Sequence, residues 1–433
     1  MAAQPLHYAA RTDANVTQLP KPLPTWGGPN GLCATYKNPA YPGSTIVRVT
    51  AANLHAGSLQ TADSGDPQLG SSDGKHFIVR ATGGTSYVIA FDPTTMACAY
   101  TGVSSSYGAL EFSDKNPLLL WALDKTWIRA ITAKPDWSGI ASDRLVVDMS
   151  SAKCLGVGFK PTWEAEFTVA DDNATFKTAF SNSGGQGSGN YAVVWSQSLG
   201  CTLWNTLTGA VTVNGASIGT VSTLARFYLH EAGAGRTALA LVAPTLKTPS
   251  GKPGCVVGKC LVDEPYVWVP YTTKVTPCNL NCDGHSAKGI DGFFTGKQQR
   301  FHSYVNPAAP LTPMVNLPAG SPDEHGSAHN QVTTQPLFLV TAKVPSPAIY
   351  PAADYDEVLA IPTDGSRQVE RLGQTMNTGK SKYFVCANAI GVVDQTGTAL
   401  YFTSDMGANG SLGYEADGKT PRCDVFALVP TPK

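Results

Sequence analysis

The sequence predicts an all-β chain. Apolar stripes with helical spacing are scarce, whereas short β-branched and aromatic runs recur between clusters of Gly, Pro, Asn and Asp. The 433 residues include 43 glycines and 31 prolines, so the chain is expected to turn often. A polar loop followed by an apolar run recurs at intervals of about 40 to 65 residues, which is typical of β-propeller blades with loop insertions.

Seven such apolar runs are candidate strands. They are residues 76–80, 118–122, 176–180, 238–243, 292–295, 337–341 and 399–403. A second recurring element is a turn opened by Asp or Asn, at Asp92, Asp148, Asn205 and in 361–365. Such side chains accept hydrogen bonds from amides further along the turn. Asp92 and Asp148 each precede a cysteine by six positions.

The end of the chain predicts how the repeat closes. Residues 356–363 and 424–431 are similar, but only the earlier unit is followed by another strand. Residues 31–36 or 45–50 could supply the missing strand and cover the open edge. We therefore predict a seven-bladed β-propeller whose last blade is completed by an N-terminal strand. An irregular pair of β-sandwiches, and rings of six or eight blades, are the alternatives.

This fold divides the chain into two parts. Residues 1–65 are an N-terminal segment that partly closes the ring, and residues 66–433 are a single propeller domain.

The charge balance limits the partners. Lys plus Arg total 31 and Asp plus Glu total 32, which gives a net charge of −1. Nucleic-acid binding requires a basic excess, so no nucleic acid is expected. No apolar stretch reaches the length of a membrane span.

Ten cysteines in a chain of low charge favour disulfides and an oxidising compartment. Cys255 with Cys260, Cys278 with Cys282, and Cys386 with Cys423 are plausible bridges. Cys278 and Cys282 could instead form half of a zinc site, although the sequence has no second half. The start of the sequence is typical of a mature secreted protein with an added methionine. We expect a secreted, periplasmic or cell-surface protein.

Three histidines share a spacing. His230, His285 and His329 each lie eight residues before a residue of an apolar run, namely Ala238, Phe293 and Leu337. If these runs are the innermost strands, the three imidazoles lie near a central channel. Neutral imidazole binds divalent metals such as Zn, Mn or Cu, and Ca is a further alternative.

Two neighbours, His325 and Gln331, could complete the metal shell. A structural role for all these histidines, satisfied by backbone hydrogen bonds, is the alternative.

Arg236 ends a Gly-rich loop and could bind the carboxylate of a ligand through two hydrogen bonds. The alternative is an ordinary salt bridge within the protein. His302 lies on an alternating strand, where a structural role is the simpler interpretation.

The blade pattern over residues 66–433 and the histidine cluster resemble secreted propellers of the TolB-like and oligogalacturonate lyase type. In those lyases, histidines and a glutamine hold a divalent metal and another histidine assists catalysis. The resemblance implies that His230, His285, His329 and Gln331 bind the metal.

The first hypothesis is therefore a metal-assisted polysaccharide lyase acting on uronate-containing glycans. β-Elimination requires a cation beside the uronate carboxylate, which neutralises it and makes the neighbouring C–H acidic; the metal or Arg236 could supply this charge. A base such as His302 or His325 would then take the proton. The first alternative is a propeller that binds glycans or proteins without catalysis. The second is a structural cell-surface protein.

Overall fold

The computed structural model describes most of the chain. The described residues are 8–13, 15, 19–61, 69–151, 153–156, 158–161, 167–170, 172–181, 191–221, 228–231, 240–245, 255–256, 259–260, 266–277, 287–288, 292–295, 300–303, 312–313, 324–327, 337–341, 356–362, 368–378, 389–407, 411–415 and 417–433. Within these ranges every regular element is a β-strand except η1, the 3-10 turn Gly28–Asn30. The all-β prediction is thus confirmed, and no described helix is long and apolar enough to cross a membrane.

The first sheet in chain order has four antiparallel strands. Its order is β3-β4-β5-β6, with bounds Leu59–Gln60, His76–Ala81, Ser86–Asp92 and Ala97–Ser105. β4 and β5 are largely buried, whereas β6 is mostly exposed. β-branched and aromatic side chains such as Phe77, Val79 and Ile89 fill the core beside the middle strands.

The next two sheets follow the same plan. The second has the order β10-β9-β8-β7, with β7 at Ala109–Phe112, β8 at Leu119–Asp124, β9 at Trp127–Ala133 and β10 at Ile140–Asp148. The third contains β11 Lys160–Pro161, β12 Thr168–Val169, β13 Thr175–Ser181, β14 Tyr191–Ser196, β15 Gly200–Asn205, β16 Ala210–Val213 and β17 Ala216–Thr220. Both β11 and β12 pair with β13, and the hairpin β16–β17 extends the outer side.

Three further four-stranded sheets follow. They are β18 Tyr228–Glu231, β19 Ala240–Thr245, β22 Tyr266–Trp268 and β23 Val275–Pro277; β24 Ala287–Lys288, β25 Gly292–Thr295, β26 Arg300–Ser303 and β27 Thr312–Pro313; and β28 Glu324–Ser327, β29 Leu337–Thr341, β30 Glu357–Ile361 and β31 Glu370–Gln374. The two-stranded pair β20 Cys255–Val256 and β21 Lys259–Cys260 is inserted between β19 and β22.

The last sheet combines the two ends of the chain. Its order is β1-β2-β34-β33-β32, with β1 Thr35–Tyr36, β2 Ser44–Arg48, β32 Gly391–Val393, β33 Leu400–Ser404 and β34 Asp424–Pro430. β2 runs antiparallel to β34, from Ser44 opposite Pro430 to Arg48 opposite Phe426. The N-terminal segment therefore supplies the two outer strands of the C-terminal sheet.

A buried ionic cluster fixes this junction. Arg48 and Arg422 both donate to the carboxylate of Asp424, with Nε of Arg48 at 3.1 Å from Oδ2 and the nearer Arg422 nitrogen at 2.7 Å from Oδ1. The hydroxyl of Thr50 donates to the same carboxylate. The three charged side chains are at most 1% exposed. The guanidinium groups also donate to six backbone carbonyls, which compensates the burial of these charges; they are those of residues 26, 28, 29, 55, 56 and 57.

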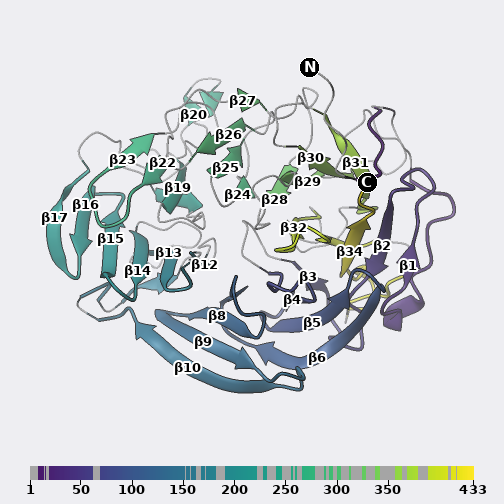
Figure 1. Ribbon diagram of the computed structural model, residues 1–433, viewed down its shortest axis with the longest axis horizontal. Helices are drawn as coiled ribbons and strands as arrows, with labels where there is room; N and C mark the ends of the chain where they lie inside the picture. Colours follow the sequence, from purple (N-terminus) through teal and green to yellow (C-terminus); the bar gives the residue numbers. More distant parts are fainter. Residues whose placement is uncertain are drawn as a thin grey trace.

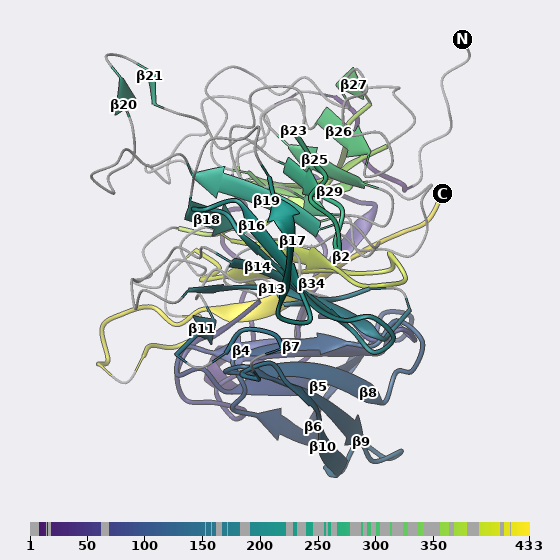
Figure 2. The same ribbon diagram turned by 90° about the vertical axis from the view of Figure 1, so that its left-hand side faces the viewer.

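The sheets succeed one another around a common centre in chain order (Figure 1). First strands such as β3, β24, β28 and β32 lie nearer the centre than outer strands such as β6, β10 and β17 (Figure 1). Figure 2 shows the sheets from the side, with β5, β6, β9 and β10 at one extremity. Small antiparallel sheets arranged in this way are the architecture of a β-propeller.

All seven predicted apolar runs are strands, but their place in the sheets differs from the prediction. They correspond to β4, β8, β13, β19, β25, β29 and β33. Five of them are the second strand of their sheet in chain order; β13 follows both β11 and β12, and β33 follows β32 in a sheet that also contains β1 and β2. None of the seven lies at the inner edge of its sheet. The second strand is packed between two neighbouring strands, so it has the most continuous apolar sequence and is the easiest to recognise. The first strands β12 and β24 have two residues each and give no such signal.

The predicted Asp and Asn turns are confirmed at three positions. Asp92 accepts hydrogen bonds from the amides of residues 94 and 95, and Asp148 accepts one from the amide of residue 150. Asn205 accepts from residues 207 and 208. The turn after Asp92 joins the third and fourth strands of a sheet, whereas Asp148 ends the fourth strand of the next sheet. The same local chemistry therefore serves different places in the fold.

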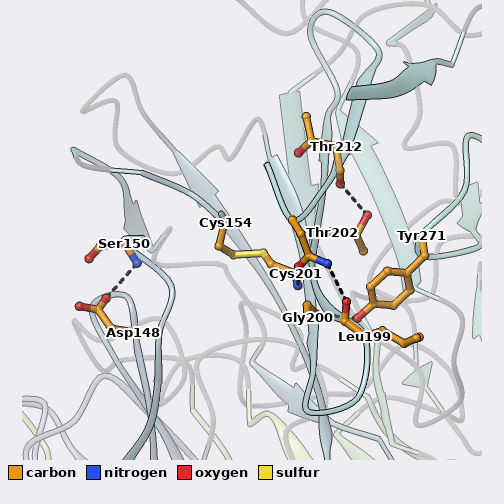
Figure 3. The surroundings of a disulfide bond; sticks show 10 residues. Asp148, Ser150, Cys154, Leu199, Gly200, Cys201, Thr202, Thr212 and Tyr271 are labelled. Carbon is orange, nitrogen blue, oxygen red and sulfur yellow. Dashed lines mark hydrogen bonds between the residues drawn. A yellow bond between two sulfur atoms is a disulfide. The ribbon is translucent and has the colours of Figure 1, made fainter. Parts of the chain in front are cut away.

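Two disulfides are present among the described residues. Cys33, beside β1, is bonded to Cys98 of β6, so this bridge joins the last sheet to the first. Cys154, after β10, is bonded to Cys201 of β15, close to the Asp148 turn and the ring of Tyr271 (Figure 3). The phenol of Tyr271 donates to the carbonyl of Gly200 at 2.8 Å.

The other cysteine pairs stay predictions. Cys255 and Cys260 are directly opposite each other across β20 and β21, as a local bridge would require. Cys423 is disulfide-bonded, and its predicted partner Cys386 lies outside the described residues. Cys278 and Cys282 also lie outside them.

Candidate functional site

The structure places the backbone of three predicted site residues. His230 is in β18, His302 in β26 and His325 in β28. Four others, Arg236, His285, His329 and Gln331, lie outside the described residues. The convergence of these side chains on one point therefore stays a prediction.

The shared spacing of the three histidines stays a prediction. His230 lies within β18. In the sequence, His285 comes two residues before β24 and His329 comes two residues after β28, but both lie outside the described residues.

The ladder between β18 and β19 is irregular at His230. Leu229 is opposite Pro244 and Glu231 is opposite Ala243, with a register shift between them. A β-bulge of this kind leaves one residue unpaired and redirects the chain locally. Bulges occur often beside binding sites, so this irregularity keeps His230 a candidate ligand.

The described residues contain no group of three or more His, Cys, Asp or Glu side chains that could hold a metal ion. The metal proposed from the sequence would depend on side chains outside those ranges. It therefore has no support from the described part of the chain.

The connections between first and second strands form one end of the sheets, here called the turn end. Those described in whole or in part, in four sheets, are 61–75, 113–118, 170–174 and 394–399. Nε2 of Gln395 donates to the carbonyls of Gly70 at 2.9 Å and Ser113 at 3.4 Å. The hydroxyl of Ser113 donates to Oδ1 of Asn173 at 2.7 Å. These bonds link the turns of four sheets, so the four turns lie on the same side of the molecule.

A buried acidic group lies at the turn end. The carboxylate of Asp394 accepts hydrogen bonds from the hydroxyls of Thr396 and Thr398 and from the amide of Thr398, each at 2.8 Å. Burial raises the pKa of Asp394, although these hydrogen bonds act in the opposite direction. Its oxygens are committed to holding the turn, which indicates a structural role.

Tyr401 is fully buried beside this turn. Its ring stacks on Phe77 with centroids 3.7 Å apart, and so joins the last sheet to the first. Burial, with Asp394 and Asp73 nearby, raises the pKa of Tyr401 well above its ordinary value. Its hydroxyl has no hydrogen-bond partner among the described residues. Nothing in the sequence indicates this group, because the contact depends on the packing of the last sheet beside the first.

His76, which has no partner nearby in sequence, makes structural contacts. Its ring stacks on Trp137 from the β9–β10 hairpin at 3.8 Å, and Nδ1 lies 3.7 Å from Asp73. It therefore helps to join the first two sheets.

The opposite end of the sheets, here called the loop end, carries the longest connections. They include 246–265, 342–356 and 405–423, which lead from second to third strands, and 375–390, which joins two sheets. Long connections on a rigid scaffold are where binding residues concentrate. The loop end is therefore the better candidate for a ligand site. At the turn end, the described side chains of Gln395 and Ser113 are already used in hydrogen bonds between neighbouring sheets.

Comparisons with known proteins complete this description. No family model and no curated protein sequence matches the chain. Among solved structures, the chain is similar to an oligogalacturonate lyase in complex with manganese, with 7% identity, TM-score 0.45 and coverage of 92% of this chain and 95% of that one. It is also similar to the Dos1 propeller, with 10% identity, TM-score 0.41 and coverage of 91% and 90%. The WD40 repeats of RRP9 give 9% identity, TM-score 0.42 and coverage of 89% and 97%.

Proposed function

We propose that the chain is a secreted seven-bladed β-propeller whose ring is completed by β1 and β2. The seven sheets of four or more strands among the described residues support this count. Two observations support closure: the pairing of β2 with β34 joins both ends of the chain in one sheet, and the bridge from Cys33 to Cys98 links this sheet to the first one. The disulfides also support an oxidising location outside the cytoplasm.

The propeller is proposed to bind a glycan at its loop end. The supporting observation is the concentration of long connections there, in contrast to the interlinked turns of the turn end, where only 61–75 is comparably long. In a ring of seven sheets all first strands run in the same direction, so these connections gather on one face. His325, the second residue of β28, lies at this face by its strand position, and His285, which precedes β24 in the sequence, is proposed to lie there too.

The ligand class that fits these residues is an oligosaccharide containing uronate. An imidazole can donate to a sugar carboxylate, and protonation makes that hydrogen bond stronger. No catalysis is required for this function, so a binding propeller is the primary proposal.

A metal-assisted uronate lyase is the second candidate. Five of the eight histidines lie between residues 230 and 329, and the bulge at His230 is the described feature that favours it. In this case His230, His285, His329 and Gln331 would hold the divalent metal. Arg236, in the connection after β18, would bind the uronate carboxylate, with His302 or His325 as a base.

Binding of uronate oligosaccharides by calorimetry tests both candidates with matched variants. The loop-end proposal expects His285→Ala and His325→Ala to weaken binding, and His329→Ala, the matched change at the other end, to leave it unchanged. The opposite pattern would refute the loop end as the site.

The lyase candidate expects stoichiometric metal in untagged protein, its loss in the His230→Ala and His329→Ala double variant, and an unsaturated product absorbing in the ultraviolet. Metal-free protein that binds the glycan without forming this product would leave only the binding function.

A further inference from the structure

Residues 8–13, here called the strap, cross between two sheets before the chain reaches β1. The amide of Ala9 donates to the carbonyl of Thr431 at 2.9 Å, beyond the end of β34. Arg11 exchanges two backbone hydrogen bonds with Arg371 of β31, at 3.3 and 2.8 Å. The strap therefore pairs with the last sheet at one point and with the outer strand of the preceding sheet at the next. This is the pattern of an extended peptide bound to exposed strands.

Two strap side chains anchor this pairing. Tyr8 is only 5% exposed, lies in a core cluster with Val358 and Leu372, and donates to the carbonyl of Gly397 at 3.2 Å. The guanidinium of Arg11 lies over the ring of Tyr41, 5.1 Å from its centroid. A buried aromatic anchor and a stacked arginine are the residue types that dominate peptide interfaces.

The body of the protein is shaped to receive the strap at Gly43. A Cβ atom at this position would lie 1.3 Å from the carbonyl oxygen of Ala9. The backbone φ of Gly43 is not in the positive region, so its own conformation does not require glycine. The amide of Thr431 donates to the carbonyl of Gly43 at 2.8 Å, which holds this residue against β34. Close approach of the strap is therefore what excludes a side chain here.

Side-chain bonds beneath the strap keep its receiving surface in place. Arg371 forms an ion pair with Glu357, whose carboxylate also accepts from the phenol of Tyr41. Nε of Arg371 donates to the carbonyl of Asp13 at 2.7 Å. Both members of the ion pair are at most 5% exposed, so the surface is formed by buried, mutually fixed side chains.

We propose that Tyr41, Gly43, Arg371, Gly397 and Thr431 form a peptide-binding site that recognises an extended segment with a tyrosine three residues before an arginine. The strap is its occupant in this structure, and a peptide of the same pattern from another molecule can replace it. The site would take such a peptide as an added strand, held by backbone bonds and selected by the Tyr and Arg side chains.

The test uses the full chain with a specific protease site inserted between Thr17 and Gln18. After cleavage, we expect residues 1–17 to stay with the body during gel filtration, and to exchange with a fluorescein-labelled peptide of residues 5–15. Labelled peptides carrying Tyr8→Ala or Arg11→Ala should bind at least about tenfold more weakly by fluorescence anisotropy. A body carrying Gly43→Ala should show a similar loss for the unchanged peptide.

Absence of exchange with a cleaved body that stays folded by circular dichroism would overturn the proposal. Equal binding of the variant peptides, or of the Gly43→Ala body, would also overturn it. The uncut chain provides a second measurement that does not depend on cleavage. There, Gly43→Ala should increase proteolysis within residues 14–18 without changing proteolysis elsewhere, and an unchanged digestion pattern would contradict a strap seated against Gly43.

Discussion

Replacing Asp424 with alanine would leave two buried guanidinium groups without the carboxylate that they share. Arg48 and Arg422 are at most 1% exposed, and Asp424 itself is fully buried. Removing one member of a buried ion pair costs about 3–5 kcal/mol, because the remaining charge is left uncompensated. Because two cations lose their partner here, we expect the free energy of unfolding to fall by an amount in the upper part of that range. Whole domains are stable by about 5–15 kcal/mol, so this loss is large.

Urea denaturation followed by tryptophan fluorescence measures this change in the free energy of unfolding. The matched control is Asp143→Ala, which removes a carboxylate paired with Arg129 at 2.8 Å on the surface. Exposed pairs contribute about 0–1 kcal/mol, so this variant should stay close to the wild type. A loss below about 1 kcal/mol for Asp424→Ala would show that the cluster does not fix the junction of the two chain ends.

Three other predictions concern separate parts of the fold. Cys33→Ser with Cys98→Ser should lower the free energy of unfolding by about 2–4 kcal/mol, measured by denaturation without reductant, and an unchanged value would mean that the bridge adds nothing. Gly102→Ala should destabilise by about 1–3 kcal/mol, because its Cβ would lie 2.1 Å from the carbonyl oxygen of Ser138, whereas Gly83→Ala, which has open space, is the control. Burial raises the pKa of Tyr100 to about 12, so relative to the ordinary value of 10.0 its contribution to stability is present below pH 10 and is lost as the pH rises to 12. In an ultraviolet titration, Tyr100→Phe should lack one of the phenols that ionise well above pH 10 in the wild type. If the variant instead lacks a phenol that ionises near pH 10, the raised pKa of Tyr100 is refuted.

The sequence predicted the elements that depend on local chemistry. Apolar runs such as 76–80 and 399–403 became strands because their β-branched and aromatic side chains suit a strand packed between two others. Asp92 and Asn205 form the expected turns because their hydrogen bonds reach only two or three residues along the chain. In both cases the information is contained within a few neighbouring residues.

The junction between the chain ends could not be predicted in detail. Arg48 looks like an exposed strand residue in sequence, and nothing near it indicates that Asp424 will neutralise it. The same reason hides the bridge between Cys33 and Cys98. These contacts follow from the order of the sheets, which local patterns do not contain.

The candidate site could be predicted only in part, because the short first strands cannot be recognised in the sequence. The histidine register was measured from second strands, whereas place in the ring depends on first strands as short as β24. The connections between first and second strands vary in length from 289–291 to 328–336, so a spacing counted from second strands does not define a place relative to the first strands.

The pairing of β2 with β34 has a consequence for biosynthesis. Arg48 cannot form its ion pair until Asp424, which is 376 residues later in the chain, has been synthesised. At about 5–20 residues per second, a ribosome takes on the order of tens of seconds to make that stretch. Throughout this time β2 has an unpaired edge that another nascent chain could join. Folding of this sheet can therefore finish only after residues 424–430 have been made, and chaperones that shield strand edges would act on β2.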